Sequence, residues 1–314
     1  IGEKLSKEEL GGWKMHVVES GQIDNVAEDE DDAFQQIREF LSYLPNTVRE
    51  VAPRVHTGDD PERRPQELLD FVPTNRRQGY DARALIRHVV DNGDFFEMRE
   101  LYASGLITGF ARLDGWSVGV IGSDPMSKAG AMDGNAADKY THFLDLCDTF
   151  NLPLLIFLDM PGFMLGSHAE RIATMRRGAR ALIASAECQV PKIEFMVRKS
   201  YGVAADAPNS IGLPNSINLR FGWPSGEWGG IPIEGGVAAA YRREIAEADD
   251  PDAHRAEIED RLLRLRSPFR AAHRGDVVDL IDPRETRALA CRFINLAQPK
   301  LAELAQRSKR AVRP

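Results

Sequence analysis

The sequence predicts an α/β fold built from alternating strands and helices. Two β-rich runs at 106–113 and 116–122 are joined by Asp114-Gly115, a strong signal for a two-residue hairpin. Further along, 152–158 is a continuous apolar run of the kind found in strands that are buried on both faces. Helical patterns separate these runs, so we expect stacked β/α units in which each helix covers its sheet.

The first 80 residues precede this alternation. An acidic run at 28–32 comes before a helical pattern that we expect to end at Pro45, because carboxylates favour the positive end of a helix dipole. Residues 51–80 are rich in Pro, Arg, Asp and Gly and show no period, which is typical of a linker or a surface-crossing segment. The apolar positions of the expected helix are Phe34, Ile37, Phe40 and Leu41.

The alternation itself begins near residue 82. A helical pattern at 84–90 precedes the hairpin, and the strand 152–158 is followed by a further strand at 193–197. The helix between the hairpin and the buried strand carries on one face Tyr140, Phe143, Leu144 and Cys147. The helix between the two later strands has an apolar stripe made of Ile172, Met175, Ala179, Leu182, Ile183 and Ala186.

The C-terminal part is strongly charged. We expect one long helix or a helix pair at 238–266, with a solvated Arg/Glu-rich face. A final helix is expected at 283–304, because Asp282 suits its N-cap and Pro283 its first turn. From Lys309 onward we expect a fraying tail.

Composition excludes several classes of partner. The net charge of −8 argues against nucleic acid, because phosphate binding needs a clustered basic surface. The apolar runs are too short to span a bilayer, and no signal-like segment opens the chain, so no membrane partner is expected. Cys147, Cys188 and Cys291 have neither CxxC nor metal-like spacing. We expect buried thiols, no metal site and a reducing compartment such as the cytoplasm.

Three glycine-bearing loops follow apolar strands, at 128–133, 159–166 and 198–206. Ligands of open α/β sheets bind at the carboxyl ends of strands, where such loops lie. Glycine lets the backbone turn sharply, and two free N–H groups can stabilise an oxyanion. The same loops also fit ordinary strand-to-helix turns. His142 and His168 are isolated, and we expect incidental structural or surface roles for both.

A series of short segments runs in order along most of the chain: 159–163 (DMPGF), 178–182 (GARAL), 190–193 (VPKI), 198–202 (RKSYG), 222–224 (GWP), 241–245 (YRREI), 267–269 (SPF) and 278–287 (VDLIDPRETR). Upstream, 10–12 (LGG) and 41–45 (LSYLP) extend it. This series resembles the carboxyltransferase subunits of biotin-dependent acyl-CoA carboxylases, in particular propionyl-CoA carboxylase β subunits.

The resemblance implies a crotonase-type fold of stacked ββα units and a division of the chain. Residues 1–50 would be the tail of a first, acyl-CoA-side domain, 51–81 an interdomain linker, and 82–314 the second, biotin-side domain. The acyl-CoA half is then expected to be largely missing from this chain, whether disordered, cleaved or encoded separately. In the family, the active site lies between the first domain of one subunit and the second domain of its dimer mate.

The implied reaction moves a carboxyl group from carboxybiotin on a carrier to the α-carbon of an acyl-CoA, through enolates held by backbone oxyanion holes. Carried over residue by residue, the N–H pair maps onto Val203 and Ala204, with Gly202 shaping the turn. Asp206, Gly162 and Phe163 map onto the biotin pocket.

The implied partners are a biotin carboxylase and a biotin carboxyl carrier, within a dimer-based homo-oligomer that we expect to be a hexamer. The implied compartment is the bacterial cytoplasm, or the mitochondrial matrix in a eukaryote.

The chain departs from the family pattern near the expected pocket. Val203 stands where the family usually has a second glycine, Leu165 where it tends to have proline, and 231–233 (IPI) where Met-Gly-Ala usually follows the Trp-Pro motif. A valine would be strained if that position required a positive φ.

Three other functions therefore stay open. The first is a decarboxylase running the reaction in reverse, and the second is a non-catalytic assembly subunit with a degenerate biotin pocket. The third is a free-standing hydratase or thioesterase, for which Asp206 is the one candidate acid or base.

Overall fold

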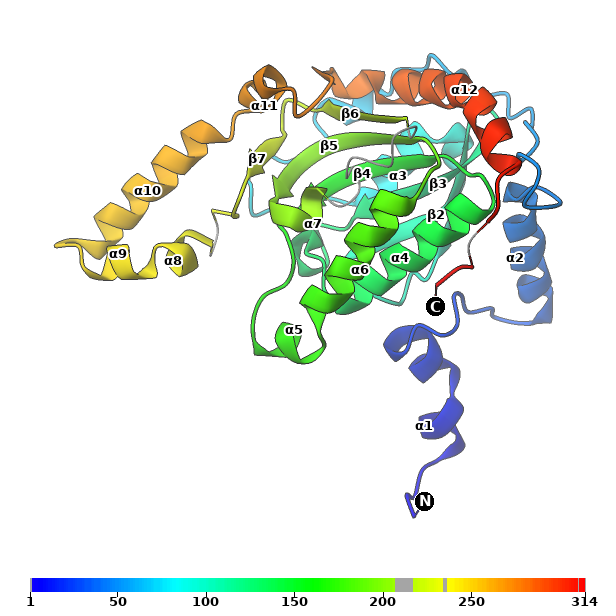
Figure 1. The fold of residues 1–314 in the computed structure, drawn as a ribbon, viewed down its shortest axis with the longest axis horizontal. Helices are drawn as coiled ribbons and strands as arrows, with labels where there is room; N and C mark the ends of the chain where they lie inside the picture. Colours follow the sequence, from blue (N-terminus) through cyan, green and yellow to red (C-terminus); the bar gives the residue numbers. More distant parts are fainter. Residues whose placement is uncertain (1, 207–216, 234–235, 310, 314) are drawn as a thin grey trace.

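A computed structural model describes residues 2–206, 217–233, 236–309 and 311–313. One sheet of eight strands forms the centre, in the order β1-β2-β3-β4-β5-β6-β8, with β7 paired to β5 (Figure 1). The predicted α/β class is confirmed. The strands are β1 Phe95–Met98, β2 Leu106–Leu113, β3 Trp116–Ser123, β4 Leu154–Met160, β5 Lys192–Tyr201, β6 Asn218–Gly222, β7 Glu227–Gly229 and β8 Asp279–Leu280.

The predicted hairpin joins β2 and β3. These strands are antiparallel, with Leu113 opposite Trp116. Asp114 and Gly115 both have positive φ, 50° and 80°, as a two-residue turn of this type requires. A Cβ at Gly115 would also lie 1.9 Å from the carbonyl oxygen of Val55. The turn therefore requires glycine on two independent grounds.

From β3 onward the sheet is parallel: β3, β4, β5 and β6 pair in sequence order. Every residue of β4 is buried, as its apolar run predicts. Alternate side chains of β4 and β5 enter two cores, with Ile156 and Met196 on one face and Phe157 and Phe195 on the other. The carboxyl ends of β4 and β5 consequently lie at the same edge of the sheet, where ligand sites of α/β proteins are built.

Helices cover both faces (Figure 1). On one face lie α4 Gly134–Thr149 and α6 Thr174–Glu187, and their residues share a core with Ile156 and Met196. On the other face lie α3 Ala82–Val89 and the middle of α12 Thr286–Ala305. Each buried large aliphatic or aromatic side chain in these cores contributes roughly 1.5–3 kcal/mol.

The orientation of α6 differs from the expectation. Its buried face consists of small residues, among them Gly178, Ala181 and Ala184. The predicted apolar stripe lies mainly on the outer side, where Met175 is 60% and Ile183 56% exposed. Small residues bring α6 close to its neighbours: a Cβ at Gly178 would lie 2.5 Å from the ring of Phe163. Ala179 of the same stripe is exposed as well, so the prediction that the stripe covers the sheet was wrong for these three residues.

The N-terminal part contains α1 Lys7–Gly11, a π-helix at Met15–Glu19 and α2 Glu30–Tyr43. The side chain of Asp29 caps α2, as the acidic run predicts. From 44 to 81 the chain is irregular apart from a 3-10 turn at Gln66–Leu68, yet Leu68 and Tyr80 are buried in the same core as α3. The boundaries at 50 and 81 stay predictions.

The charged C-terminal stretch forms three helices rather than one or two: α8 Gly236–Ala240, α9 Arg242–Ala246 and α10 Pro251–Leu265. They project from the body as an arm (Figure 1). The break before α10 comes from Asp250, whose side chain accepts from the N–H of Ala253, and from Pro251 in the first turn. Ile233, Val237 and Ile258 form a small core of their own within the arm.

After the arm come α11 Pro268–Arg274, a 3-10 turn at Pro283–Glu285 and α12. Asp282 accepts from the N–H of Arg284 and so caps the 3-10 turn, whereas the N-cap of α12 is Glu285, which makes no side-chain cap bond. The predicted cap is therefore confirmed for the turn that leads into α12 and not for α12 itself. In the described part of the tail the prediction of fraying is wrong, because Arg313 forms two bonds of 2.6 and 2.7 Å to the Asp145 carboxylate on α4. Residues 310 and 314 of the tail lie outside the described ranges. All three cysteines are buried free thiols. None of the helices in the described ranges combines the length and apolar character that crossing a membrane requires.

Candidate active site

The three glycine-bearing loops meet at the carboxyl ends of β3, β4 and β5. The first contains a 3-10 turn at Lys128–Gly130, the second leads into α5 Ser167–Arg171, and the third ends in α7 Gly202–Asp206. The N–H of Met132 donates to the Gly162 carbonyl at 3.0 Å, which joins the first two loops. The N–H of Lys199 donates to Oδ1 of Asp159 at 3.0 Å, which joins the last two.

A buried ion pair supports this junction. The Arg198 guanidinium lies 2.9 Å from the Asp159 carboxylate, and both side chains are almost fully buried. Arg198 also donates to the carbonyl oxygen of Gln78, and its guanidinium lies 5.1 Å from the ring centre of Tyr80. Burial and then the neighbouring Asp159 carboxylate raise the pKa of Tyr80, so its hydroxyl stays protonated. The strand ends are thus held against the 44–81 segment.

The turn from β5 into α7 depends on Gly202, which has φ +63°. Because α7 begins at this residue, the N–H groups of Val203 and Ala204 lie in its first turn, where no helical carbonyl precedes them. Val203 is not among the described residues with positive φ, so its branched Cβ is not strained there. Only the first position of the turn, Gly202, therefore requires glycine.

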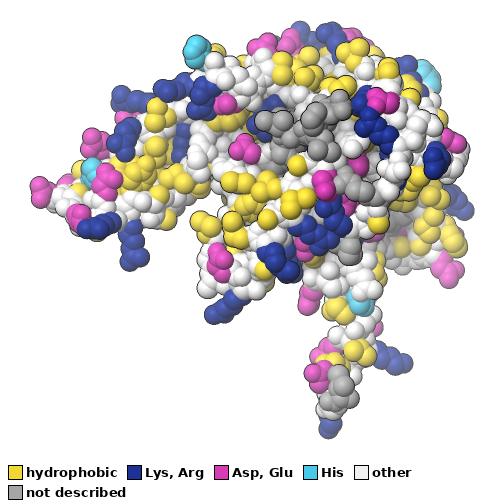
Figure 2. Space-filling view, in the orientation of Figure 1, with side chains coloured by type: hydrophobic (Ala, Val, Ile, Leu, Met, Phe, Trp, Pro, Cys, Tyr) yellow, Lys and Arg dark blue, Asp and Glu magenta, His cyan; other side chains and the backbone are white. Residues whose placement is uncertain are grey.

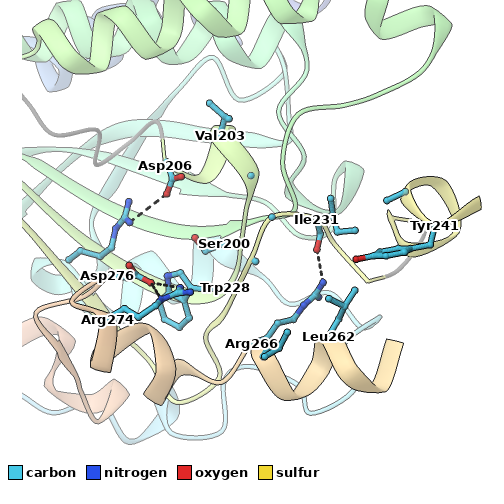
Figure 3. A pocket seen from close by; sticks show the side chains of 16 residues that line it. Ser200, Val203, Asp206, Trp228, Ile231, Tyr241, Leu262, Arg266, Arg274 and Asp276 are labelled. Carbon is cyan, nitrogen blue, oxygen red and sulfur yellow. Dashed lines mark hydrogen bonds and ion pairs between the residues drawn. The ribbon is translucent and has the colours of Figure 1, made fainter. Parts of the chain in front are cut away.

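A cavity of about 920 Å³ opens beside this turn (Figure 3). Its body side is lined by Ser200, Gly202, Val203 and Asp206, continuing through residues 228–231. The arm supplies the facing wall, through α10 and the α8–α9 region. The cavity therefore lies between the sheet edge and the arm.

The predicted site residues divide into two groups. Gly202, Val203 and Asp206 line the cavity, and Ala204 is buried beside them. Gly162 and Phe163 do not line it: a Cβ at Gly162 would lie 3.4 Å from the Tyr201 carbonyl, and Phe163 packs on α6. Gly162 therefore lies close to the Tyr201 backbone, and Phe163 lies against Gly178 of α6. Among the residues that depart from the family pattern, Ile231 lines the cavity and Leu165 is exposed.

A polar network that the sequence did not reveal surrounds Tyr201. Its hydroxyl donates to Oε2 of Glu227 at 2.5 Å and accepts from Nη1 of Arg266 at 2.8 Å. Glu227 also pairs with Arg76 at 2.6 Å. Burial and then the Glu227 carboxylate raise the pKa of Tyr201, so the hydroxyl stays protonated and keeps donating. The chain offers no local signal for these contacts, because the partners lie 26 to 151 residues apart.

Asp206 lies at the cavity mouth, with its carboxylate 3.8 Å from the Arg220 guanidinium. Arg220 is bound on its other side to Glu194 at 3.0 Å. Burial raises the pKa of Glu194, and Arg220 opposes that rise. The Asp206 side chain is largely exposed, and Asp206, Arg220 and Glu194 form a row of alternating charges.

The chemistry available here is anion stabilisation by backbone N–H groups and arginines. Within the described ranges no group of His, Cys, Asp or Glu side chains is arranged to hold a metal ion. His142 contacts the Arg313 carbonyl at 3.0 Å on the far side of α4, and His168 is exposed on α5. Neither histidine lines the cavity.

Comparisons with known proteins agree on one family. Residues 1–312 match the carboxyl transferase domain. A propionyl-CoA carboxylase carboxyltransferase subunit of Haloferax mediterranei is 40% identical over 91% of this chain and 55% of its own length. The α subunit of a methylmalonyl-CoA decarboxylase of Veillonella parvula is 38% identical over 91% of this chain and 54% of its own.

A solved structure is also similar. The transcarboxylase 12S hexamer, with methylmalonyl-coenzyme A and methylmalonic acid bound, superposes with a TM-score of 0.86 at 38% identity, covering 100% of this chain and 58% of its own. The predicted crotonase-type fold is therefore confirmed. The chain spans about 55% of the length of these relatives.

Proposed function

Because the chain belongs to the carboxyl transferase family, we propose that it forms the carboxybiotin-binding half of a biotin-dependent acyl-CoA carboxyltransferase. The observation that carries the proposal is the turn at Gly202, which presents the N–H groups of an opening helix beside a cavity of about 920 Å³. Paired N–H groups in such a position stabilise an oxyanion without any ionisable side chain.

The roles of the chain's own residues follow from this geometry. Val203 and Ala204 donate their N–H groups to the developing oxyanion, and the positive φ of Gly202 aims them. The cavity is large enough for a bicyclic ureido ring, and ligand sites of this kind occupy roughly 300–1,000 Å³. When bound, carboxybiotin supplies the carboxyl group that is transferred.

The remaining predicted residues act around this centre. Asp206 lines the biotin side of the cavity and is oriented by Arg220. Gly162 and Phe163 act indirectly, by holding the Tyr201 backbone and α6. The acyl group is a coenzyme A thioester whose chain length the residues of this cavity do not specify.

The proposed assembly is a dimer-based homo-oligomer working with a biotin carboxylase and a biotin carboxyl carrier. Hydrophobic side chains gather over α6 and α7 (Figure 2), among them Met175, Ile183 and Val203. A contiguous apolar surface of this kind is typical of a subunit interface. The free thiols favour a reducing compartment, such as the bacterial cytoplasm or the mitochondrial matrix.

A decarboxylase acting in reverse is the second candidate, favoured by the similarity to the Veillonella subunit. The same N–H groups would serve both directions, because an enzyme stabilises one transition state for both. A non-catalytic assembly subunit is disfavoured, because Val203 is unstrained and retains its N–H. A hydratase or thioesterase is disfavoured because the largely exposed Asp206 carboxylate is paired with Arg220.

The test is carboxylation by the reconstituted complex. Full-length protein is combined with its biotin carboxylase and carrier, ATP, labelled bicarbonate and propionyl-CoA. The proposal predicts acid-stable label in the acyl-CoA. Release of label from methylmalonyl-CoA to the carrier, without ATP-dependent fixation, would favour the decarboxylase. No transfer in either direction would overturn the proposal.

A further inference from the structure

Arg266 lies at the end of α10 and lines the same cavity as Gly202 and Val203. The residue is 5% exposed, so its charge is almost entirely removed from bulk water. Nη1 donates to the Tyr201 hydroxyl at 2.8 Å, and Nη2 donates to the Ile231 carbonyl at 2.5 Å. Figure 3 shows this side chain reaching from α10 toward the 231 segment, across the cavity wall.

Both of these acceptors are neutral. No carboxylate in the described part of the chain lies within ion-pair distance of Arg266. Glu227, on the other side of Tyr201, is already paired with Arg76. The guanidinium has five N–H donors, and the two bonds to Tyr201 and Ile231 use two of them.

The other arginines of the cavity are different. Arg220 is bound to the Glu194 carboxylate, and Arg274 is bound to Asp276 at 2.5 Å. Among the described arginines that line this cavity, only Arg266 is buried without a carboxylate partner. Burying a cation costs free energy unless an anion lies beside it. The cation–π contact between the Arg266 guanidinium and the Tyr201 ring offsets only part of that cost.

We propose that Arg266 is an anion-binding residue of the cavity, and that it takes the carboxylate of the carboxylated substrate. The planar guanidinium matches a carboxylate, and its open donors add bonds to the two that it already makes. This inference rests on the proposed function for the identity of the anion. The binding role itself follows from burial and charge, independently of turnover.

The experiment is calorimetric titration of the full-length protein with methylmalonate, a small dicarboxylate, and with its neutral dimethyl ester. The wild type is expected to bind the dianion and not the ester. R266M is expected to bind methylmalonate at least about tenfold more weakly, since a hydrogen bond to a charged group is worth about 1.5–3 kcal/mol. The matched control is R264M, which removes an exposed arginine of the same helix and should change binding by less than about twofold.

A second variant covers the case in which R266M does not fold. L265E places a carboxylate on the cavity wall at a half-exposed position, where it should neutralise Arg266 and weaken methylmalonate binding by at least about tenfold. A256E, which adds the same charge at an exposed position of α10 away from this cavity, is its control. Methylmalonate binding that is undetectable in the wild type, or unchanged in R266M or L265E, would overturn the inference.

The carboxyl-transfer assay separates this inference from the proposed function. If the wild type transfers label but R266M binds as the wild type does, Arg266 has no such role and the function stands. If the wild type transfers nothing yet binding depends on Arg266, the anion site stands and the function fails.

Discussion

Arg198 and Asp159 form an ion pair of 2.9 Å in which the side chains are 4% and 2% exposed. The pair joins the carboxyl ends of β4 and β5, and the Asp159 carboxylate also accepts the N–H of Lys199. Two of the three loops at the candidate site therefore share one buried carboxylate. Their geometry depends on an electrostatic contact beneath the cavity as well as on their own glycines.

Asp159→Asn is expected to destabilise the protein by about 3–5 kcal/mol, because it leaves the buried Arg198 charge uncompensated. The measurement is the free energy of unfolding in urea. Glu247→Gln, which breaks the exposed pair with Arg243, is the control and should cost less than about 1 kcal/mol. Equal effects of the two substitutions would contradict this account.

Gly202→Ala and Val203→Gly are expected to differ in the size of their effect on carboxyl transfer. A Cβ at φ +63° costs about 1–2 kcal/mol and turns the N–H groups of α7 away, so carboxyl transfer should fall at least about tenfold. Val203→Gly should leave transfer within about twofold, since Val203 has no positive φ. The measurement is kcat for both variants. A large gain of activity in Val203→Gly would instead support the assembly-subunit function.

Because of Lys139, we expect the free energy of unfolding to depend on pH in the alkaline range. Its Nζ donates to the carbonyl oxygens of Arg99, Tyr102 and Leu106, and burial lowers the pKa from 10.5 to about 7. Above pH 7 the unfolded chain keeps a proton that the native protein loses, so stability rises with pH by up to about 1.4 kcal/mol per unit. The unfolded thiols of the three cysteines titrate near the top of the window of pH 7–8.5, and comparison with a variant that lacks only Lys139 cancels their contribution.

The measurement is the free energy of unfolding across that window for the wild type and Lys139→Met. The rise is expected in the wild type only, although the variant is less stable throughout because three carbonyl groups lose their donor. A wild-type stability that is flat from pH 7 to 8.5 would show that the carbonyl oxygens keep the ammonium charged.

Ile183→Asp tests the proposed subunit interface on α6. Since Ile183 is 56% exposed in a single chain, the substitution should leave the helix folded but dissociate the oligomer. Light scattering or sedimentation measures the mass. Leu296→Asp, at a more exposed position on α12, is the control and should leave the mass unchanged. Dissociation by both variants, or by neither, would contradict an interface on α6.

Local patterns predicted four of the eight strands, β2 to β5, and missed β1, β6, β7 and β8. The Asp114-Gly115 turn and the apolar run of β4 each specify their structure through nearby residues, and both predictions are confirmed. The buried face of α6 was predicted wrongly from its apolar stripe. Small residues allow closer packing than large ones, so the helix turns its Gly178 side inward. The break before α10 has a local signal in the sequence, the N-cap Asp250 followed by Pro251 in the first turn.

The site was only partly predictable. Gly202 and Val203 lie in one continuous motif, which is why the turn could be located. Arg266 and Glu227 reach Tyr201 from separate elements, and no spacing rule relates residues that meet only after the sheet and the arm have formed. The cavity depends on the arm in the same way, because its facing wall comes from residues beyond 236.

The most direct measurement is a single turnover without ATP. Full-length protein is mixed with isolated carrier bearing labelled carboxybiotin and with propionyl-CoA, and acid-stable label in the acyl-CoA is followed over time. We expect rapid transfer by the wild type and at least about tenfold slower transfer by Gly202→Ala. Transfer that is absent in the wild type, or equally fast in both proteins, would contradict an oxyanion site at the first turn of α7.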